Sequence, residues 1–129
     1  MACSCLAILF RPRFGRYGKQ GGKIPAAALV EDSKGNLYGT TYQGGTMQCG
    51  DKSGCGVLFL VNQAAGKEIV VHRFMNNSSD GGYPSAPLVH LKGSFYGTTQ
   101  LGGTNNCGTV FQYTPAGASS SRSKSNRKK

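Results

Sequence analysis

The stretch PAAALVEDSKGNLYGTT, residues 25–41, decides the fold, because it returns later in the chain as PSAPLVHLKGSFYGTT, residues 84–99. The recurrence continues in order: GGT at 44–46 returns at 102–104, and CGVLF at 55–59 returns as CGTVF at 107–111. The offset falls along the repeat from 59 to 58 to 52 residues, through losses at the turn near Ser33 and in the loop TMQCGDKSGCG, which becomes TNNCG. A repeated folding unit tolerates losses in its loops, so the chain contains two copies of one unit.

The residues of one unit favour short strands. LYGTT at 37–41 is rich in β-formers and follows the turn KGN, and the apolar runs VLFLV at 57–61 and EIVVHRF at 68–74 flank the loop NQAAGK. With the extended AALV at 27–30, each unit offers about four strands. In the last strand the two-residue period predicts two faces, one with Ile69, Val71 and Arg73 and the other with Val70, His72 and Phe74.

The composition agrees with many turns and few helices. The 129 residues include 20 Gly, near twice the usual share of about 7%, which argues against a helical bundle. No run approaches the roughly 18 apolar residues of a membrane-spanning helix. Four antiparallel strands in each unit are typical of a β-propeller blade, and a propeller needs about four to eight blades. We therefore expect an all-β fold of propeller-like antiparallel blades, with about two units, as a fragment of a larger repeat array.

The segment before the first unit resembles the segment before the second. In ILFRPRFGRYGKQGGKIP, Phe14 lies near the place of Phe74, and Gly21-Gly22 match Gly81-Gly82 of IVVHRFMNNSSDGGYP. This predicts the last strand of a preceding blade. The expected organisation is a basic N-terminal segment holding that strand (1–24), a first repeat (25–83), a second, truncated repeat (84–115) and a disordered basic tail (116–129).

The motifs LYGTT, GG, CGVLFLV and DGGYPSAPLV resemble the GloVer-type bacterial tandem-repeat family over roughly residues 25–115. The resemblance implies a propeller-like, extracytoplasmic repeat protein and names no activity. The N-terminal MACSCLAILF has no basic residue before its short apolar run, which is unlike a secretory signal peptide.

The net charge of +10 belongs to the two ends of the chain. Residues 1–24 and 116–129 each carry five Lys or Arg and no acid, whereas five cations and five acids balance between them. Basic tails bind phosphates and anionic surfaces. The candidate anion-binding residues are Arg122, Lys124, Arg127, Lys128 and Lys129.

The chain has five cysteines, an odd number that cannot all pair within one molecule. Cys49 and Cys55 enclose five residues of one loop and are the candidate disulfide in an oxidising compartment. Cys107 occupies the repeat position of Cys55 without a partner equivalent to Cys49, so it is a packed or free thiol. Neither CxxC pairs nor zinc-like His spacing occur, and we expect no metal and no cofactor.

Catalytic signatures are missing from the sequence. There is no GxSxG, His72 and His90 do not recur between the units, and the oxygen-rich segment 76–82 suits a hydrogen-bonded turn better than a calcium loop. Tyrosines could supply a sugar-stacking or peptide-binding surface, although the recurrence of Tyr38 and Tyr96 favours a structural role for those two.

We therefore expect a non-catalytic β-repeat module with a binding or structural role, whose ligand, protein or carbohydrate, the sequence does not name. Open blade edges could also pair with another chain. The alternatives are a binder of nucleic acid or of anionic surfaces through the basic ends, and part of a propeller hydrolase.

Overall fold

The computed structural model describes residues 21–46, 49 and 52–116 of the chain, and every regular element in these ranges is a strand. The all-β prediction is therefore confirmed. The strands are β1 (Gly22–Pro25), β2 (Val30–Glu31), β3 (Leu37–Gly44), β4 (Val57–Asn62), β5 (Lys67–Arg73), β6 (Gly81–Gly82), β7 (Val89–Leu91), β8 (Ser94–Thr99), β9 (Leu101–Gly102) and β10 (Thr109–Tyr113).

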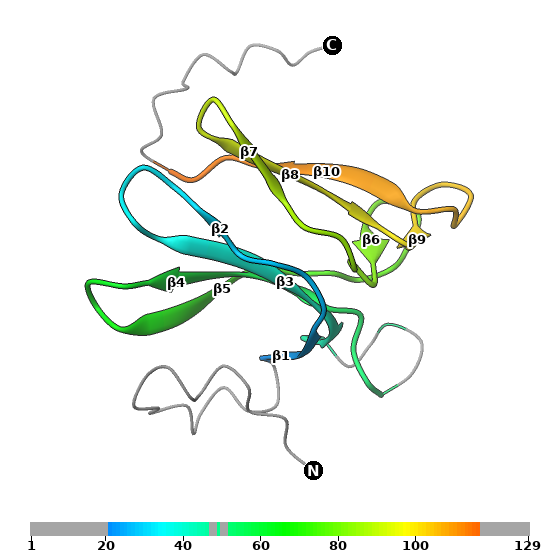
Figure 1. Ribbon diagram of the computed structural model, residues 1–129. Helices are drawn as coiled ribbons and strands as arrows, with labels where there is room; N and C mark the ends of the chain where they lie inside the picture. Colours follow the sequence, from blue (N-terminus) through cyan, green and yellow to red (C-terminus); the bar gives the residue numbers. More distant parts are fainter. Residues whose placement is uncertain (1–20, 47–48, 50–51, 117–129) are drawn as a thin grey trace.

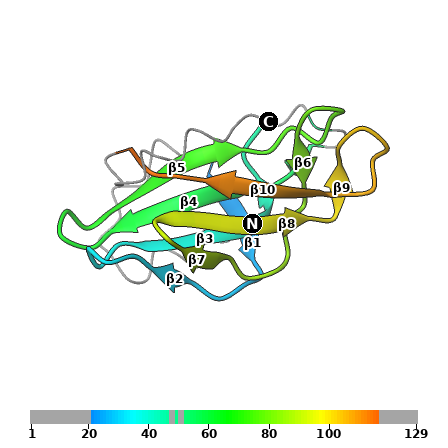
Figure 2. The same ribbon diagram turned by 90° about the horizontal axis from the view of Figure 1, so that it is seen from above.

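The strands form two antiparallel layers. Sheet 1 has the order β1-β3-β4-β5, with β2 also paired to β3, and is the lower layer in Figure 1. Sheet 2 has the order β10-β8-β7 and is the upper layer, beside the small pair β6-β9. Seen from above, sheet 2 lies over sheet 1 with the long strands running roughly along one another (Figure 2). This is the aligned packing of two twisted sheets across an apolar layer.

The two sheets repeat one pattern of strand pairing. Val30 lies opposite Tyr38 in sheet 1, as Val89 lies opposite Tyr96 in sheet 2. Five residue pairs join β3 to β4, and five pairs at the equivalent positions join β8 to β10. The pair β6-β9 repeats the far end of β1-β3. Sheet 2 and the pair β6-β9 together thus contain the counterparts of β1 to β4, whereas β5 has no counterpart among the described residues.

The turn near Ser33 explains the first loss in the repeat. In the first copy, the Asp32 carboxylate accepts the backbone N–H groups of Lys34 and Asn36 at 2.8 and 2.9 Å, which organises a five-residue turn. In the second copy Lys92 and Gly93 both have positive φ, as a two-residue type I′ hairpin requires. Both turns therefore join equivalent strands, β2 to β3 and β7 to β8, and they keep the equivalent residues paired.

The main core lies between the layers. Sheet 1 contributes Tyr38, Leu58 and Phe74, and sheet 2 contributes Phe95 with Leu88 beside it. The Tyr38 and Phe95 ring centroids lie 3.9 Å apart. We call these two surfaces the interlayer faces. The opposite side of sheet 1, its outer face, carries a second cluster of Val57, Phe59 and Val61, with Leu37 and Val70 packed against it.

The predicted faces of β5 hold as far as Val71 and are wrong after it. The pairing of β4 with β5 shifts between Leu58 and Phe59, so Val71 is the extra residue of a β-bulge. Val70 packs in the outer cluster, whereas Val71 and Phe74 both pack in the interlayer core. A bulge adds one residue to the strand, so the two-residue period fails after it. His72 lies opposite Leu58 and therefore on the side of Val71, and its ring centroid lies 4.8 Å from that of Phe74, as their shared predicted face requires.

The match of Gly21-Gly22 with Gly81-Gly82 is wrong by one residue. Gly22 lies opposite Gly44 and Gly81 lies opposite Gly102, so Gly22 corresponds to Gly81. The rest of the proposed strand in 1–24 and nearly all of the tail lie outside the described residues. The repeat boundaries and the propeller-like arrangement stay predictions.

Candidate functional site

Polar and aromatic side chains gather where the two repeats join, at the β6-β9 end of the molecule. Tyr42 of the first repeat packs on Tyr83, with ring centroids 5.1 Å apart. The Tyr42 hydroxyl donates to Gln100 Oε1 at 3.1 Å, and the Gln100 amide donates to Ser85 Oγ at 2.9 Å. Both hydrogen bonds are exposed to solvent, so this cluster is a surface feature that links residues of both repeats.

The loop with the two paired cysteines borders this cluster. The structure joins Cys49 and Cys55 in a disulfide, with Cα atoms 5.9 Å apart. Both side chains are buried against the interlayer core. The backbone N–H of Tyr83 donates to the Cys55 carbonyl at 2.8 Å, which ties the loop to the residue just before the second repeat. Cys107 is an exposed free thiol in the shorter loop of the second repeat.

The oxygen-rich segment 76–82 forms a hydrogen-bonded turn. Asn77 and Asp80 exchange backbone hydrogen bonds at 3.2 Å. The Asp80 carboxylate accepts the backbone N–H groups of Met75 and Gly81 at 2.8 and 2.9 Å, and His72 Nε2 lies 3.1 Å from both carboxylate oxygens. Asp80 therefore holds its own turn and the end of β5, and its oxygens are already used by these donors.

The second histidine, His90, packs on a core aromatic ring of sheet 2. The His90 ring stacks on Phe95 with centroids 4.4 Å apart and an interplanar angle of 9°. His72 and His90 thus lie on different sheets, each against a phenylalanine, as their failure to recur predicted. Among the described residues, no group of three His, Cys, Asp or Glu side chains is placed to hold a metal ion. Within the same ranges, no helix has the length and apolar character needed to span a membrane.

Three of the perturbed pKa values belong to Tyr38, Asp32 and Tyr113 beside the interlayer core. Burial raises the pKa of Tyr38 to about 12, with a further contribution from the Asp32 carboxylate, which accepts its hydroxyl at 3.3 Å. Burial alone would raise the pKa of Asp32, but the hydrogen bonds from Asn36, Lys34 and Tyr38 outweigh it and lower this pKa. Burial also raises the pKa of Tyr113. The phenol of Tyr38 thus joins the core to the turn after β2.

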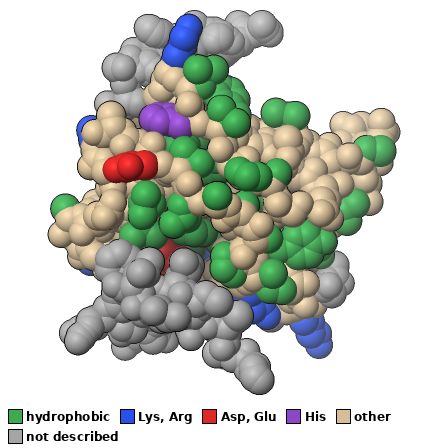
Figure 3. Space-filling model, viewed as in Figure 1, with side chains coloured by type: hydrophobic (Ala, Val, Ile, Leu, Met, Phe, Trp, Pro, Cys, Tyr) green, Lys and Arg blue, Asp and Glu red, His purple; other side chains and the backbone are tan. Residues whose placement is uncertain are grey.

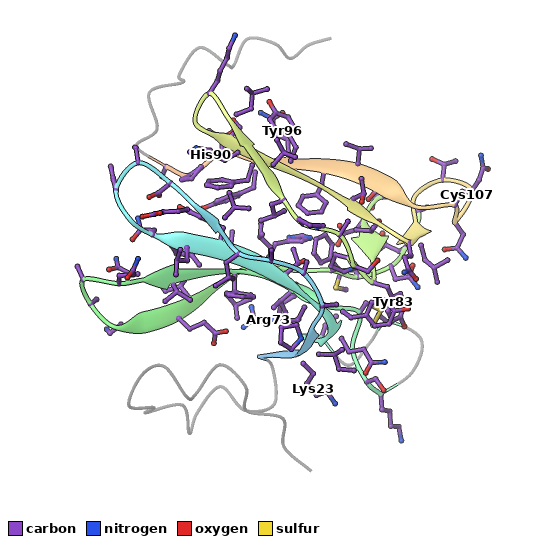
Figure 4. All side chains as sticks on the ribbon, viewed as in Figure 1. Lys23, Arg73, Tyr83, His90, Tyr96 and Cys107 are labelled. Carbon is purple, nitrogen blue, oxygen red and sulfur yellow. A yellow bond between two sulfur atoms is a disulfide. The ribbon has the colours of Figure 1, made fainter. Side chains whose placement is uncertain are left out.

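The outer face of sheet 2 presents apolar side chains to solvent. Val89 and Val110 are exposed and Tyr96 is half-buried. Figure 3 shows hydrophobic side chains gathered over the upper sheet near β7, and Figure 4 shows Tyr96 pointing away from sheet 1. The recurrence of Tyr38 and Tyr96 indicated a structural role for both, yet only Tyr38 is covered. The sequence signal for this surface was the recurrence of the same apolar positions in the second unit.

The anion-binding candidates Arg122, Lys124, Arg127, Lys128 and Lys129 lie outside the described residues, as do Cys3 and Cys5.

A family model described as the Gloeobacter/Verrucomicrobia repeat matches residues 12–126. Neither a curated protein nor a solved structure matches the chain.

Proposed function

The chain belongs to the Gloeobacter/Verrucomicrobia repeat family, and we propose that it is a non-catalytic structural and binding module whose working surfaces are the faces of its sheets. In this role each repeat packs one face against the next repeat, as successive blades of a propeller-like array do. The repeats then act together as a scaffold, and recognition takes place on the faces at the ends of the array.

The observation that carries the proposal is the contact between the two repeats. Tyr38 packs on Phe95, and Phe74 packs on Phe111 with ring centroids 5.2 Å apart. These apolar side chains come from the interlayer face of sheet 1 and the interlayer face of sheet 2. Aromatic pairs of this kind add about 0.5–1.5 kcal/mol each beyond the burial of their area.

The polar groups near this contact support the same role. Asp32 accepts hydrogen bonds from its own turn, and Asp80 does so as well. Gln100 and Tyr42 connect one repeat to the other. Polar side chains that stabilise turns and the joint between repeats are what a scaffold needs.

The test is whether the two repeats form one cooperative unit. Nearest-neighbour interfaces contribute a large share of the stability of repeat proteins, so loss of the contact should weaken both repeats. We expect Tyr38→Ala to lower the hydrogen-exchange protection of amides in β4 and in β8 together. Tyr96→Ala is the matched control, because Tyr96 is the repeat equivalent of Tyr38 on an uncovered face, and it should change protection little.

The proposal fails if Tyr38→Ala leaves the protection of β8 unchanged while β4 opens. The two sheets would then be independent, and the contact between them would have no role in a scaffold.

A further inference from the structure

The outer face of sheet 2 repeats a surface that is a packing interface elsewhere in the same molecule. The pairing registers make Val89 the counterpart of Val30, Tyr96 of Tyr38 and Val110 of Leu58. In sheet 1 these positions form the interlayer face, which sheet 2 covers. The second repeat therefore keeps the residue types of a buried face at positions that its own fold leaves open.

The exposed fractions of equivalent side chains differ accordingly. Leu58 is 1% exposed and Val110 is 77% exposed, although the two occupy the same place in their repeats. Val89 is 59% exposed, whereas Val30 packs against the interlayer core. Leu58 lies in a central strand, next to β5 and under sheet 2, whereas Val110 lies in the edge strand β10 and no described strand covers it.

The first repeat shows the complementary difference at the other end of the molecule. Leu88 lies over Gly97 beside Phe111 and packs into the interlayer core, where it is 5% exposed. Leu29 lies over Gly39 beside Phe59 in the same arrangement, yet it is 41% exposed. Leu29 is thus the exposed leucine of the equivalent face in the first repeat, beside the buried side chains of Phe59 and Val61.

From these two matched ends we propose that the outer face of sheet 2 docks a second copy of this chain, which is seated by the Leu29 side of its first repeat. The contact repeats the internal one, in which Leu88 and Phe95 of the second repeat cover the interlayer face of sheet 1. It rests on the proposed function, since it extends the packing of repeats from one chain to two. Each copy offers one surface of each kind, so the association is heterologous and continues into a ring or an open chain of copies.

Both surfaces present apolar side chains, Leu29 on one and Val89 and Val110 on the other. Phe59 and Val61 on the outer face of sheet 1 are already buried, so the new contact centres on Leu29 and the half-buried Leu37. On the other side, Gln112 replaces the apolar Leu60, but its amide lies 3.2 Å from Ser94 Oγ and 3.3 Å from Thr114 Oγ1. A docked copy therefore covers an amide that already has partners within its own sheet.

The experiment uses sedimentation velocity of the full chain over a range of concentrations. Val110→Asp places a carboxylate on one surface, and Leu29→Asp places one on the other. Each should weaken association by about tenfold or more, because docking would bury an unpaired charge. Ala64→Asp, at an exposed position in the β4-β5 turn, adds the same charge away from both surfaces and should leave association unchanged.

Mixing the two single variants distinguishes a head-to-tail contact from a symmetric one. The Leu29→Asp copy keeps an intact sheet 2 surface, and the Val110→Asp copy keeps an intact Leu29 surface. Their mixture should form a dimer that does not grow further, although each variant alone stays monomeric. Circular dichroism confirms the fold of each variant, and Val89→Asp and Leu29→Asn replace any that loses strand content.

Three outcomes would overturn the proposal. The wild-type chain could stay monomeric at all concentrations, or Leu29→Asp could associate as well as the wild type, which would indicate a symmetric contact. Association insensitive to both variants would indicate pairing through open strand edges instead. None of these results bears on the coupling of β4 and β8 within one chain, so failure here is distinguishable from failure of the proposed function.

Discussion

The repeat offers a matched pair of substitutions, Leu58→Ala and Val110→Ala, that tests how much stability comes from the contact between the sheets. The two residues occupy the same register position in their repeats. One is buried between the sheets and the other faces solvent. A difference in their cost well beyond the one carbon by which Leu and Val differ therefore reports the burial of Leu58 between the sheets.

The expected magnitudes follow from the exposed fractions. Leu58→Ala removes three carbons that are buried, worth about 2.4 kcal/mol at about 0.8 kcal/mol each. The cavity adds to this, and we expect a total of about 3 kcal/mol within the usual range of about 2–5 kcal/mol. Val110→Ala removes two carbons from a side chain that is 77% exposed, so we expect a loss of only about 0.4 kcal/mol.

The assay is urea unfolding at low micromolar concentration, where association through the outer face of sheet 2 is least. Far-UV circular dichroism follows the strands, and tyrosine fluorescence follows the core, since the chain has six Tyr and no Trp. Unchanged denaturant slopes would show that the unfolded states remain comparable. If Val110→Ala cost as much as Leu58→Ala, or if Leu58→Ala cost less than about 1 kcal/mol, the interlayer contact would not be the main source of stability.

Three further predictions concern the loop, the core and the joint between repeats. Peptide mapping of non-reduced, exported protein should find Cys49 linked to Cys55 while Cys107 reacts with an alkylating agent, and reduction of so small a ring should cost at most about 2 kcal/mol. Tyr38 has a folded-state pKa of about 12 against an ordinary 10, so its phenol contributes stability that is present below pH 10 and is lost as the pH rises toward 12. Unfolding at stepped pH should show a fall of about 2–3 kcal/mol from this group, and Tyr38→Phe should remove that part of the pH dependence. Gly81→Ala would place a methyl group against the hydroxyl of Thr99 and should lower the unfolding midpoint, with a cost of about 1–3 kcal/mol.

The recurrence in the sequence was sufficient to predict most strands of the fold. LYGTT and VLFLV became β3 and β4, and their counterparts became β8 and β10. The reason is local, since turn residues, β-formers and alternation act within a few positions of the chain. Local residue patterns also explain the error in β5, because no residue pattern near Val71 predicts an extra residue in the strand.

The pairing of particular surfaces was not predictable from the same pattern. Both faces of β4 are apolar, with Leu58 and Leu60 on one side and Val57, Phe59 and Val61 on the other, so alternation does not indicate which side meets sheet 2. Tyr42 and Gln100 belong to different repeats, and no sequence pattern predicts that their side chains are in contact. Their contact depends on how the two repeats are oriented.

The sequence by itself determined the two repeats, their all-β character and the loops in which they differ, because each of these follows from local residue patterns. Only the tertiary structure decided that the interlayer face of the first repeat is covered while the same face of the second is open. The physical reason is that burial belongs to pairs of surfaces. Leu58 and Val110 occupy the same register position, but β5 and sheet 2 make Leu58 core, whereas Val110 lies in an edge strand on an open face.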